Sequence, residues 1–454
     1  MRLIYLNLKH NRVSMSKHLI IIFFSLINIF ILQAQPSDTL SFKESFAVGL
    51  ENNYGIRVAR NQNEVMDNNV SLGNAGFLPK IDASAAYSGS VNDARLEFLN
   101  DETVEREGAR ASSFTAGASL NWTLFDGLNM FVTYSQLKTL QNQGELSVRL
   151  TIEDFFFNLA SVYYNIIQQQ QLLEAATQTA LLSDDRLRVT NEKLVLGAAG
   201  RYDVLQAQVA LNADSSRLLL QEENLKRAKI QLNQMLSRQP MTAFMVEDSI
   251  PLFPMVAYDS LISAALSNNT ELLMAQNNTL LSQQDLSLVK GRRLPEITAN
   301  LGYQYNNSTS EAGFVKENTN IGFNYGVTAR VTLFDGFNQH RQVQNAQILQ
   351  QNSMLQVAEK EEEIRAELAI AYLVYQHALR LVLFEEKSVR VAQQNLGIAL
   401  ERYRLGNLSG LEMREVQNDF MGAASRLITT RYQAKMAEVA LLRLTGQLLP
   451  EVNQ

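Results

Sequence analysis

The chain has 454 residues, enough for two or three ordinary domains with a substantial core. Its formal net charge of −6 argues against a general affinity for nucleic-acid phosphates, which requires a basic surface. Because the chain has no cysteine and only four histidines, we expect no disulfide, no lipidated N-terminal cysteine, no metal site and no cofactor.

The first 34 residues have the layout of a secretory signal peptide. From Lys17 a positive flank precedes an apolar run over 19–32, and small residues surround Ala34, after which we expect cleavage. A transmembrane anchor is the alternative, but this run of 14 residues is short for a helix that spans a bilayer. Met15 directly precedes the leader, so a start at Met15 instead of Met1 stays open. No segment after Ala34 is expected to be long and apolar enough for a membrane helix, so we expect membrane contact from strands or from an interfacial surface.

Two copies of one supersecondary unit make up the rest of the chain. The motif TLFDG occurs at 123–127 and again at 332–336, and an offset of 209 residues keeps the sequences after it in step. Upstream the offset is 216, and the difference of 7 residues falls between Ser88 and Ser113, in a loop that tolerates changes of length. We therefore predict a leader and signal peptide, a first repeat, a linker and a second repeat over residues 1–34, 35–240, 241–258 and 259–454.

Each repeat has two segments in which polar and apolar residues alternate. In one of them an apolar row from Phe114 to Leu124 alternates with a polar row from Thr115 to Thr123. Such alternation over about ten residues, with aromatic residues toward the ends, is typical of transmembrane β-barrel strands. The four predicted strands cover about 81–90, 113–124, 297–307 and 321–333.

A soluble antiparallel sheet with one wet face gives the same alternation and is the alternative. Four strands are too few to close a barrel, since about eight is the usual minimum. An open sheet in lipid leaves backbone groups unpaired, which costs several kcal/mol for each group. Because the chain is predicted to be exported, we favour several chains that share one barrel.

Long helical hairpins follow the strands, over about 128–237 in the first repeat and about 337–445 in the second. The first helix of each hairpin, over about 128–196 and 337–405, contains no proline. A helix of that length extends on the order of 100 Å. Apolar positions spaced 3.5 residues apart predict left-handed coiled-coil packing, to which we assign no chemistry. In the second repeat they are Val416, Phe420, Ala423, Leu427, Thr430, Ala434, Ala437, Leu441 and Leu444. The positions 209 residues earlier form the same row in the first repeat: Ala207, Leu211, Asp214, Leu218, Gln221, Leu225, Ala228, Leu232 and Met235.

Each hairpin turns at a leucine followed by a glycine. The pairs are Leu196 with Gly197, and Leu405 with Gly406. Glycine relieves the left-handed turn after a helix, so an ordinary helical cap explains the glycines alone. The paired apolar leucines at the tips suggest in addition a docking surface.

The signal peptide, the repeat, the four strands, the two TLFDG motifs and the Leu-Gly tips together resemble the TolC-like outer-membrane efflux protein family. The resemblance covers essentially all of the predicted mature chain. It implies a mainly α fold with a transmembrane β part, in which three protomers share one twelve-stranded barrel and continue it as a coiled-coil α-barrel in the periplasm. It also implies the outer membrane of a Gram-negative bacterium as the location. The implied partners are a homotrimer, outer-membrane lipid, a periplasmic adaptor (membrane fusion) protein and an inner-membrane pump of the RND or ABC type, with no nucleic acid.

The resemblance also implies three groups of functional residues. The periplasmic gate falls on Asp203, Tyr403, Glu412 and Glu415. The tips that dock the adaptor fall on Leu196, Gly197, Leu405 and Gly406. The junctions where strand passes into helix fall on Asp126, Gly127, Asp335 and Gly336.

Three copies of Glu412 and Glu415 around one axis would make an acidic constriction, of the kind that admits cations or holds the width of a pore. The alternative is that both are solvated helix residues. The best-known member of the family has an arginine two residues beyond the tip glycine, where this chain has Leu408. The contact that locks the gate then uses Arg404 or Arg414, or differs in kind.

The implied function is the outer-membrane exit duct of a tripartite efflux or type I secretion system, which conducts passively and is not an enzyme. A secreted coiled-coil structural protein or adhesin is the alternative, but it does not predict amphipathic strands of ten residues. A periplasmic enzyme is a third hypothesis, yet His340 and His377 lie in helical patterns without a cluster of acidic or serine residues. The class of pump and the transported substrate stay open.

Overall fold

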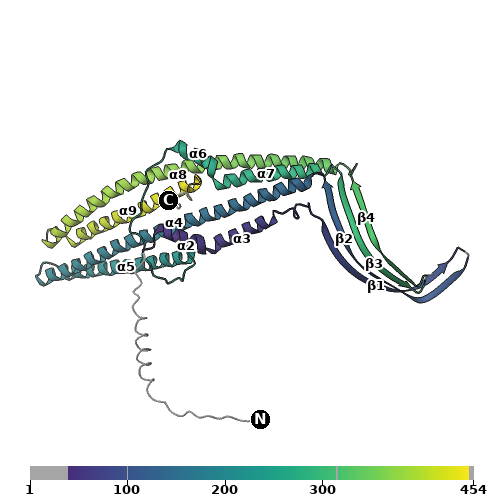
Figure 1. The fold of residues 1–454 in the computed structure, drawn as a ribbon. Helices are drawn as coiled ribbons and strands as arrows, with labels where there is room; N and C mark the ends of the chain where they lie inside the picture. The colour runs from purple at the N-terminus through teal and green to yellow at the C-terminus, as the bar shows by residue number, and fades with distance from the viewer. Residues whose placement is uncertain (1–38, 100, 313–314, 449–454) are drawn as a thin grey trace, which may run out of the picture.

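The computed structural model describes residues 39–99, 101–312 and 315–448, so the predicted leader lies outside the described residues. Long helices lie side by side along one rod, and a curved sheet continues from one end of it (Figure 1). The described chain is therefore mainly helical with a four-stranded antiparallel sheet, which confirms the predicted mainly α fold with a β part.

The sheet has the strand order β1-β2-β3-β4, with every neighbouring pair antiparallel. Its strands are β1 (Lys80–Glu97), β2 (Thr103–Asp126), β3 (Glu296–Ser310) and β4 (Glu317–Arg330). The two halves of the chain meet inside the sheet, where Ala116 of β2 lies opposite Tyr305 of β3. The chain thus provides one continuous sheet, with β1 and β4 as its free edges.

The two faces of the sheet differ in chemistry. On one face Ser113 and Thr115 donate to Asn306 Oδ1 at 3.2 and 3.3 Å. On the other, large apolar side chains are exposed, among them Ile81, Tyr87, Phe114, Trp122, Leu301, Tyr303, Phe323, Tyr325 and Val327. This is the arrangement of a sheet with lipid on one side and water on the other.

The strands differ in length from the predicted segments for local reasons. The β1-β2 hairpin extends to the pair Glu97 and Thr103, because residues expected in the loop pair across it after a shift of register near Asn92. At the opposite edge β4 ends at Arg330, which lies opposite Glu296, the first residue of β3. Residues 331–333 of this edge strand therefore have no partner strand in the described chain.

The helices repeat in the same order in both halves. The first half has α2 (Phe42–Asn52), α3 (Tyr54–Asn69), α4 (Asn129–Val195) and α5 (Arg201–Met235). The second has α6 (Tyr258–Asn268), α7 (Thr270–Gly291), α8 (Asn338–Arg404) and α9 (Gly410–Leu444). Both long helices have 67 residues and both return helices have 35.

The main core lies in the middle of the rod, where α2, α4 and α5 meet the linker. Tyr163, Ile166 and Leu232 are fully buried there. The hydroxyl of Tyr163 donates to the carbonyl of Leu40 at 3.0 Å, which anchors the start of the described chain. The hairpin tips lie at one end of the rod and the sheet lies at the other, with this core between them (Figure 1).

One helix of the described chain, α8, is long and apolar enough to cross a membrane by length and composition. A window of 18 residues in it has a mean hydropathy of 1.3, and 22% of that window is buried. The expectation that no segment after the leader passes this test was therefore wrong. The reason is that α8 carries a second apolar row beside its packed face, formed by Ile370, Leu373, Val374, Leu381 and Phe384, all exposed.

Candidate functional site at the hairpin tips

The two hairpin tips have the same backbone design. Gly197 has φ +74° and Gly406 has φ +82°, a left-handed conformation that glycine adopts without strain. Apart from the glycine and its two chain neighbours, no heavy atom of the described residues lies within 4 Å of a Cβ built on either glycine, so the turns are open to solvent. The preceding Leu196 and Leu405 are 81% and 74% exposed. The tips thus present apolar side chains that nothing in the described chain covers.

Two of the predicted gate carboxylates cap the helices that follow the tips. Asp203 Oδ2 accepts from the backbone N–H of Gly200 at 2.8 Å, and Glu412 Oε2 accepts from that of Ser409 at 2.8 Å. The hydrogen bond from the Ser409 backbone holds the pKa of Glu412 below its ordinary value. Glu415, three residues further along α9, is exposed. The side chains of Glu412 and Glu415 are therefore both exposed on the surface of the chain.

Tyr403, at the end of α8, instead lies buried against the first hairpin. Only 6% of it is exposed, and its hydroxyl lies 2.6 Å from Oγ1 of Thr190 on α4. Lys193 Nζ donates to the carbonyl of Tyr403 and lies 4.0 Å from the centroid of its ring. These contacts bind the end of the second long helix to the first.

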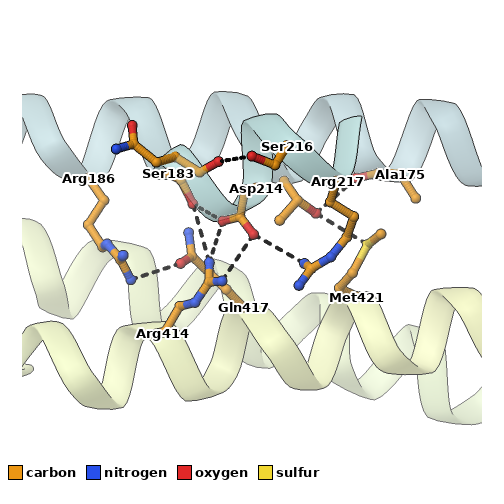
Figure 2. A network of polar contacts seen from close by, with 11 residues as sticks. Ala175, Ser183, Arg186, Asp214, Ser216, Arg217, Arg414, Gln417 and Met421 are labelled. Carbon is orange, nitrogen blue, oxygen red and sulfur yellow. Dashed lines mark hydrogen bonds and ion pairs between the residues drawn. The ribbon is translucent and has the colours of Figure 1, made fainter. Parts of the chain in front are cut away.

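A buried polar network joins the same two hairpins further along the rod (Figure 2). Its centre is Asp214 of α5, of which 1% is exposed. Arg414 of α9 binds both carboxylate oxygens, with Nη2 at 3.0 Å from Oδ1. Ser183 of α4 donates to Oδ2 at 2.6 Å, and Arg217 Nη1 lies 3.1 Å from Oδ1. One carboxylate thus holds three helices together.

The network keeps Asp214 ionised. Burial by itself raises the pKa of this carboxyl, but the hydrogen bonds from Arg414 and Ser183 and the nearby guanidinium charges together bring the pKa below its ordinary value. Next to it, Arg186 is 6% exposed and donates to Gln417 Oε1 at 3.2 Å. Burial and the charge of Arg414 lower the pKa of Arg186.

Arg404 and Arg414, the two candidates for the contact that locks the gate, both contact the first hairpin. Arg414 does so through Asp214, and Arg404 Nη2 lies 3.2 Å from Oδ2 of Asp185 on α4. Sequence reasoning missed Asp214, because it was counted as one position of the coiled-coil row. A signal was present in the sequence, because the first repeat has the carboxylate of Asp214 at the position where the second repeat has Ala423.

The tips enclose a cavity of about 650 Å³ between the hairpins. Its polar walls are formed by Arg186, Lys193, Asp203, Tyr403, Glu412 and Arg414. Three of the four predicted gate residues therefore line one space, while Glu415 does not belong to its wall. No group of three histidines or carboxylates that could hold a metal ion occurs in the part of the chain that the structure describes.

The two TLFDG motifs differ in their surroundings at the strand-to-helix junctions. Asp335 Oδ2 accepts from the N–H of Gln339 at 2.7 Å. By contrast, one carboxylate oxygen of Asp126, the last residue of β2, is buried and has no hydrogen-bond partner among the described residues. Gly127 and Gly336 both have positive φ, +74° and +68°. A Cβ on Gly127 would lie 2.2 Å from the carbonyl oxygen of Gly291, but a Cβ on Gly336 would meet no atom closer than 3.9 Å.

Known proteins resemble this chain over nearly its whole length. The family described as Outer membrane efflux protein matches residues 49–238 and 261–447. The outer membrane efflux protein BepC of Brucella suis is 20% identical over 418 residues, which cover 92% of this chain and 87% of BepC. The proteases secretion protein PrtF of Dickeya chrysanthemi is 19% identical over 432 residues, 92% of this chain and 90% of PrtF. The crystal structure of the outer membrane protein VceC from Vibrio cholerae has a similar fold, with a TM-score of 0.71, 14% identity and coverage of 89% of this chain and 96% of VceC.

Proposed function

The chain belongs to the outer membrane efflux protein family, and from that premise we propose that three copies of it build one gated duct. The protein is an outer-membrane channel that extends into the periplasm and serves as an exit duct in export. Its relatives in family and fold are channel proteins, so we assign it a passive conducting role and no catalysis.

The open sheet is the main observation that supports a barrel shared by three copies. One face is apolar and exposed, and β1 and β4 have free edges, which are too costly to leave unpaired in lipid. Three copies supply twelve strands, more than the roughly eight that closure requires. The exposed apolar row on α8, with Leu373 and Phe384, suits burial against a neighbouring copy of the helical part.

The two repeats contribute equivalent parts to this duct. Their proposed bounds are 35–240 and 259–454, joined by the linker 241–258 and preceded by a leader, 1–34, that is removed on export. The equal lengths of the long helices and the match of the family to two successive segments support this division. The helices continue the barrel as a periplasmic tunnel.

The gate lies at the tips, where three copies of Glu412 and Glu415 form an acidic ring, with Asp203 beside it. Tyr403 and Arg414 hold the second hairpin against the first, and opening separates them. The contacts of Tyr403 with Thr190 and of Arg414 with Asp214 support this assignment, because both must break for the hairpins to part.

The partners act at the tips and beyond them. A periplasmic adaptor docks on Leu196, Gly197, Leu405 and Gly406, which are exposed and uncovered. The inner-membrane pump, of the RND or ABC type, supplies the energy of transport and selects the cargo. The name of the relative PrtF is consistent with a type I secretion system as one such setting.

Single-channel recording in planar bilayers tests the gate. The double variant Glu412→Gln and Glu415→Gln removes both charges, and glutamine still caps α9. We expect a higher conductance for large anions and a preference for cations that falls at least twofold. Glu222→Gln with Glu223→Gln on α5 removes the same charge away from the tips and is expected to behave like the wild type. Unchanged selectivity in the tip variant would refute the gate while leaving the duct intact.

A further inference from the structure

A cluster of exposed cations lies where the second repeat passes from helix into sheet. Lys290, Arg292 and Arg293 stand at the end of α7, directly before β3. Arg341 lies in the first turn of α8, which is tied to the same place because Gln339 Nε2 donates to the carbonyl of Val289. We call these four cations the basic junction: Lys290, Arg292, Arg293 and Arg341.

The charge of the basic junction is not neutralised by the protein. None of its four side chains forms an ion pair with a carboxylate within residues 39–99, 101–312 and 315–448. The nearby carboxylates include those of Asp126, Glu296 and Asp335. Asp126 lies in register with Glu296 on β3, and Asp335 accepts from Gln339 N at the start of α8. Glu296 lies in register with Arg330 on β4. A surplus of positive charge is therefore left at this end of the sheet.

Exposed apolar side chains lie at the same level of the molecule. Leu333, Phe334 and Phe337, between β4 and α8, are 92%, 74% and 73% exposed. The rings of Phe334 and Phe337 meet edge to face, with 5.5 Å between their centroids. Cations next to exposed aromatic and aliphatic groups form an amphipathic surface, which suits the boundary between hydrocarbon and headgroups.

The first repeat shows that the fold does not require these charges. At the matching positions it has Asn74, Gly76, Phe77 and Val132. There Phe77 packs edge to face on Phe131 at 5.0 Å, and its carbonyl accepts from Trp122 Nε1 at 2.9 Å. One junction is thus closed by aromatic packing, whereas the other exposes four cations.

We propose that the basic junction binds the phosphate headgroups of anionic phospholipids in the periplasm-facing leaflet of the outer membrane. Arginine forks match phosphate oxygens in pairs, and clustered cations next to a membrane attract anionic lipid. The apolar side chains of Leu333, Phe334 and Phe337 enter the acyl region beside them. The proposal rests on the membrane placement of the sheet, with the junction at the surface of the bilayer.

Retention of phosphatidylglycerol in detergent tests the proposal. The full-length protein is mixed with micelles that contain equal amounts of phosphatidylglycerol and phosphatidylcholine, and bound lipid is counted by native mass spectrometry. The wild type is expected to retain phosphatidylglycerol in at least threefold preference. Arg292→Gln with Arg293→Gln should lose more than half of that preference. Lys226→Gln with Arg227→Gln, an equal loss of exposed charge on α5, should keep it.

Three results would overturn the proposal. The first is an equal preference in the variant Arg292→Gln with Arg293→Gln and in the wild type. The second is thermal stabilisation by inorganic phosphate as large as that by phosphatidylglycerol, which indicates a site for free anions. The third is a variant Arg292→Gln with Arg293→Gln that retains lipid like the wild type but has an altered ion selectivity in bilayers, because that result places the cations in the pore. A failure to form any channel would instead count against the proposed duct, so the two ideas are tested separately.

Discussion

The two helical hairpins have the same frame but different interiors. Each pairs a helix of 67 residues with one of 35 and turns at a glycine with positive φ. Yet Asp214 occupies a core position of the first hairpin where the second has Ala423. Its partner Arg414 belongs to the second hairpin, where the first has Leu205. The repeat supplies matching helices, and charges placed in one copy only then link the copies.

Removing the buried carboxylate is expected to have the largest effect. Asp214→Ala, which copies the second hairpin, leaves Arg414, Ser183 and Arg217 without their common acceptor. The expected loss of stability is about 3 kcal/mol, at the low end for a broken buried ion pair because Arg217 reaches solvent. Thermal unfolding of the purified assembly measures it.

The reciprocal variant sharpens the comparison. Ala423→Asp places a carboxylate at a site that is 3% exposed. The first hairpin has Leu205 at the position that matches Arg414, so it supplies no matching guanidinium. The substitution should destabilise the protein as well. If either substitution proves neutral, the two core positions are interchangeable, and the proposed role of Asp214 in joining the hairpins is wrong.

The glycines of the two TLFDG motifs provide a second contrast. Gly127→Ala forces a Cβ to within 2.2 Å of the Gly291 carbonyl and also strains the backbone, so the chain must shift there. The expected cost is about 2–3 kcal/mol. Gly336→Ala meets no close neighbour, and its cost is the backbone strain alone, about 1 kcal/mol. Denaturant unfolding of the two variants compares them, and equal costs would contradict the tighter packing of the first junction.

The smallest expected effect is the change with pH, near neutrality, in the contribution of Asp214 to stability. The folded-state pKa of Asp214 is depressed, so its contribution is fully present above the unfolded pKa of about 4 and is lost as the pH falls through the folded value. The difference in melting temperature between wild type and Asp214→Ala should stay constant from about pH 6 to 8. Below about pH 4 the difference should shrink. If the difference already shrinks as the pH falls from 8 to 6, then Arg414 does not keep Asp214 ionised in that range.

Much of the fold follows from patterns within each repeat. The alternation around Phe114 and the regular apolar spacing around Leu441 each have one physical cause: the apolar and polar faces of a strand in the first case, and the packed face of a helix in the second. The ends of the strands depended on pairing instead. Val331 lost its predicted strand because no neighbour reaches it, and Glu97 gained one because Thr103 does.

The site was less accessible from sequence, because it joins residues far apart in the chain. Glycine turns at 197 and 406 and the carboxylates after them are local signals, and the structure shows those turns. The partners of Tyr403 and Arg414 are 213 and 200 residues away. Only the difference between the repeats at Asp214 pointed to such a contact, and it is visible when the two halves are aligned.

The pooling of strands from several chains is the claim on which the duct depends. Native mass spectrometry of the mature protein in mild detergent measures the number of chains directly. We expect three chains in one assembly that stays intact only while detergent or lipid covers the apolar face of the sheet. A monomer that remains soluble in water without detergent would contradict the account.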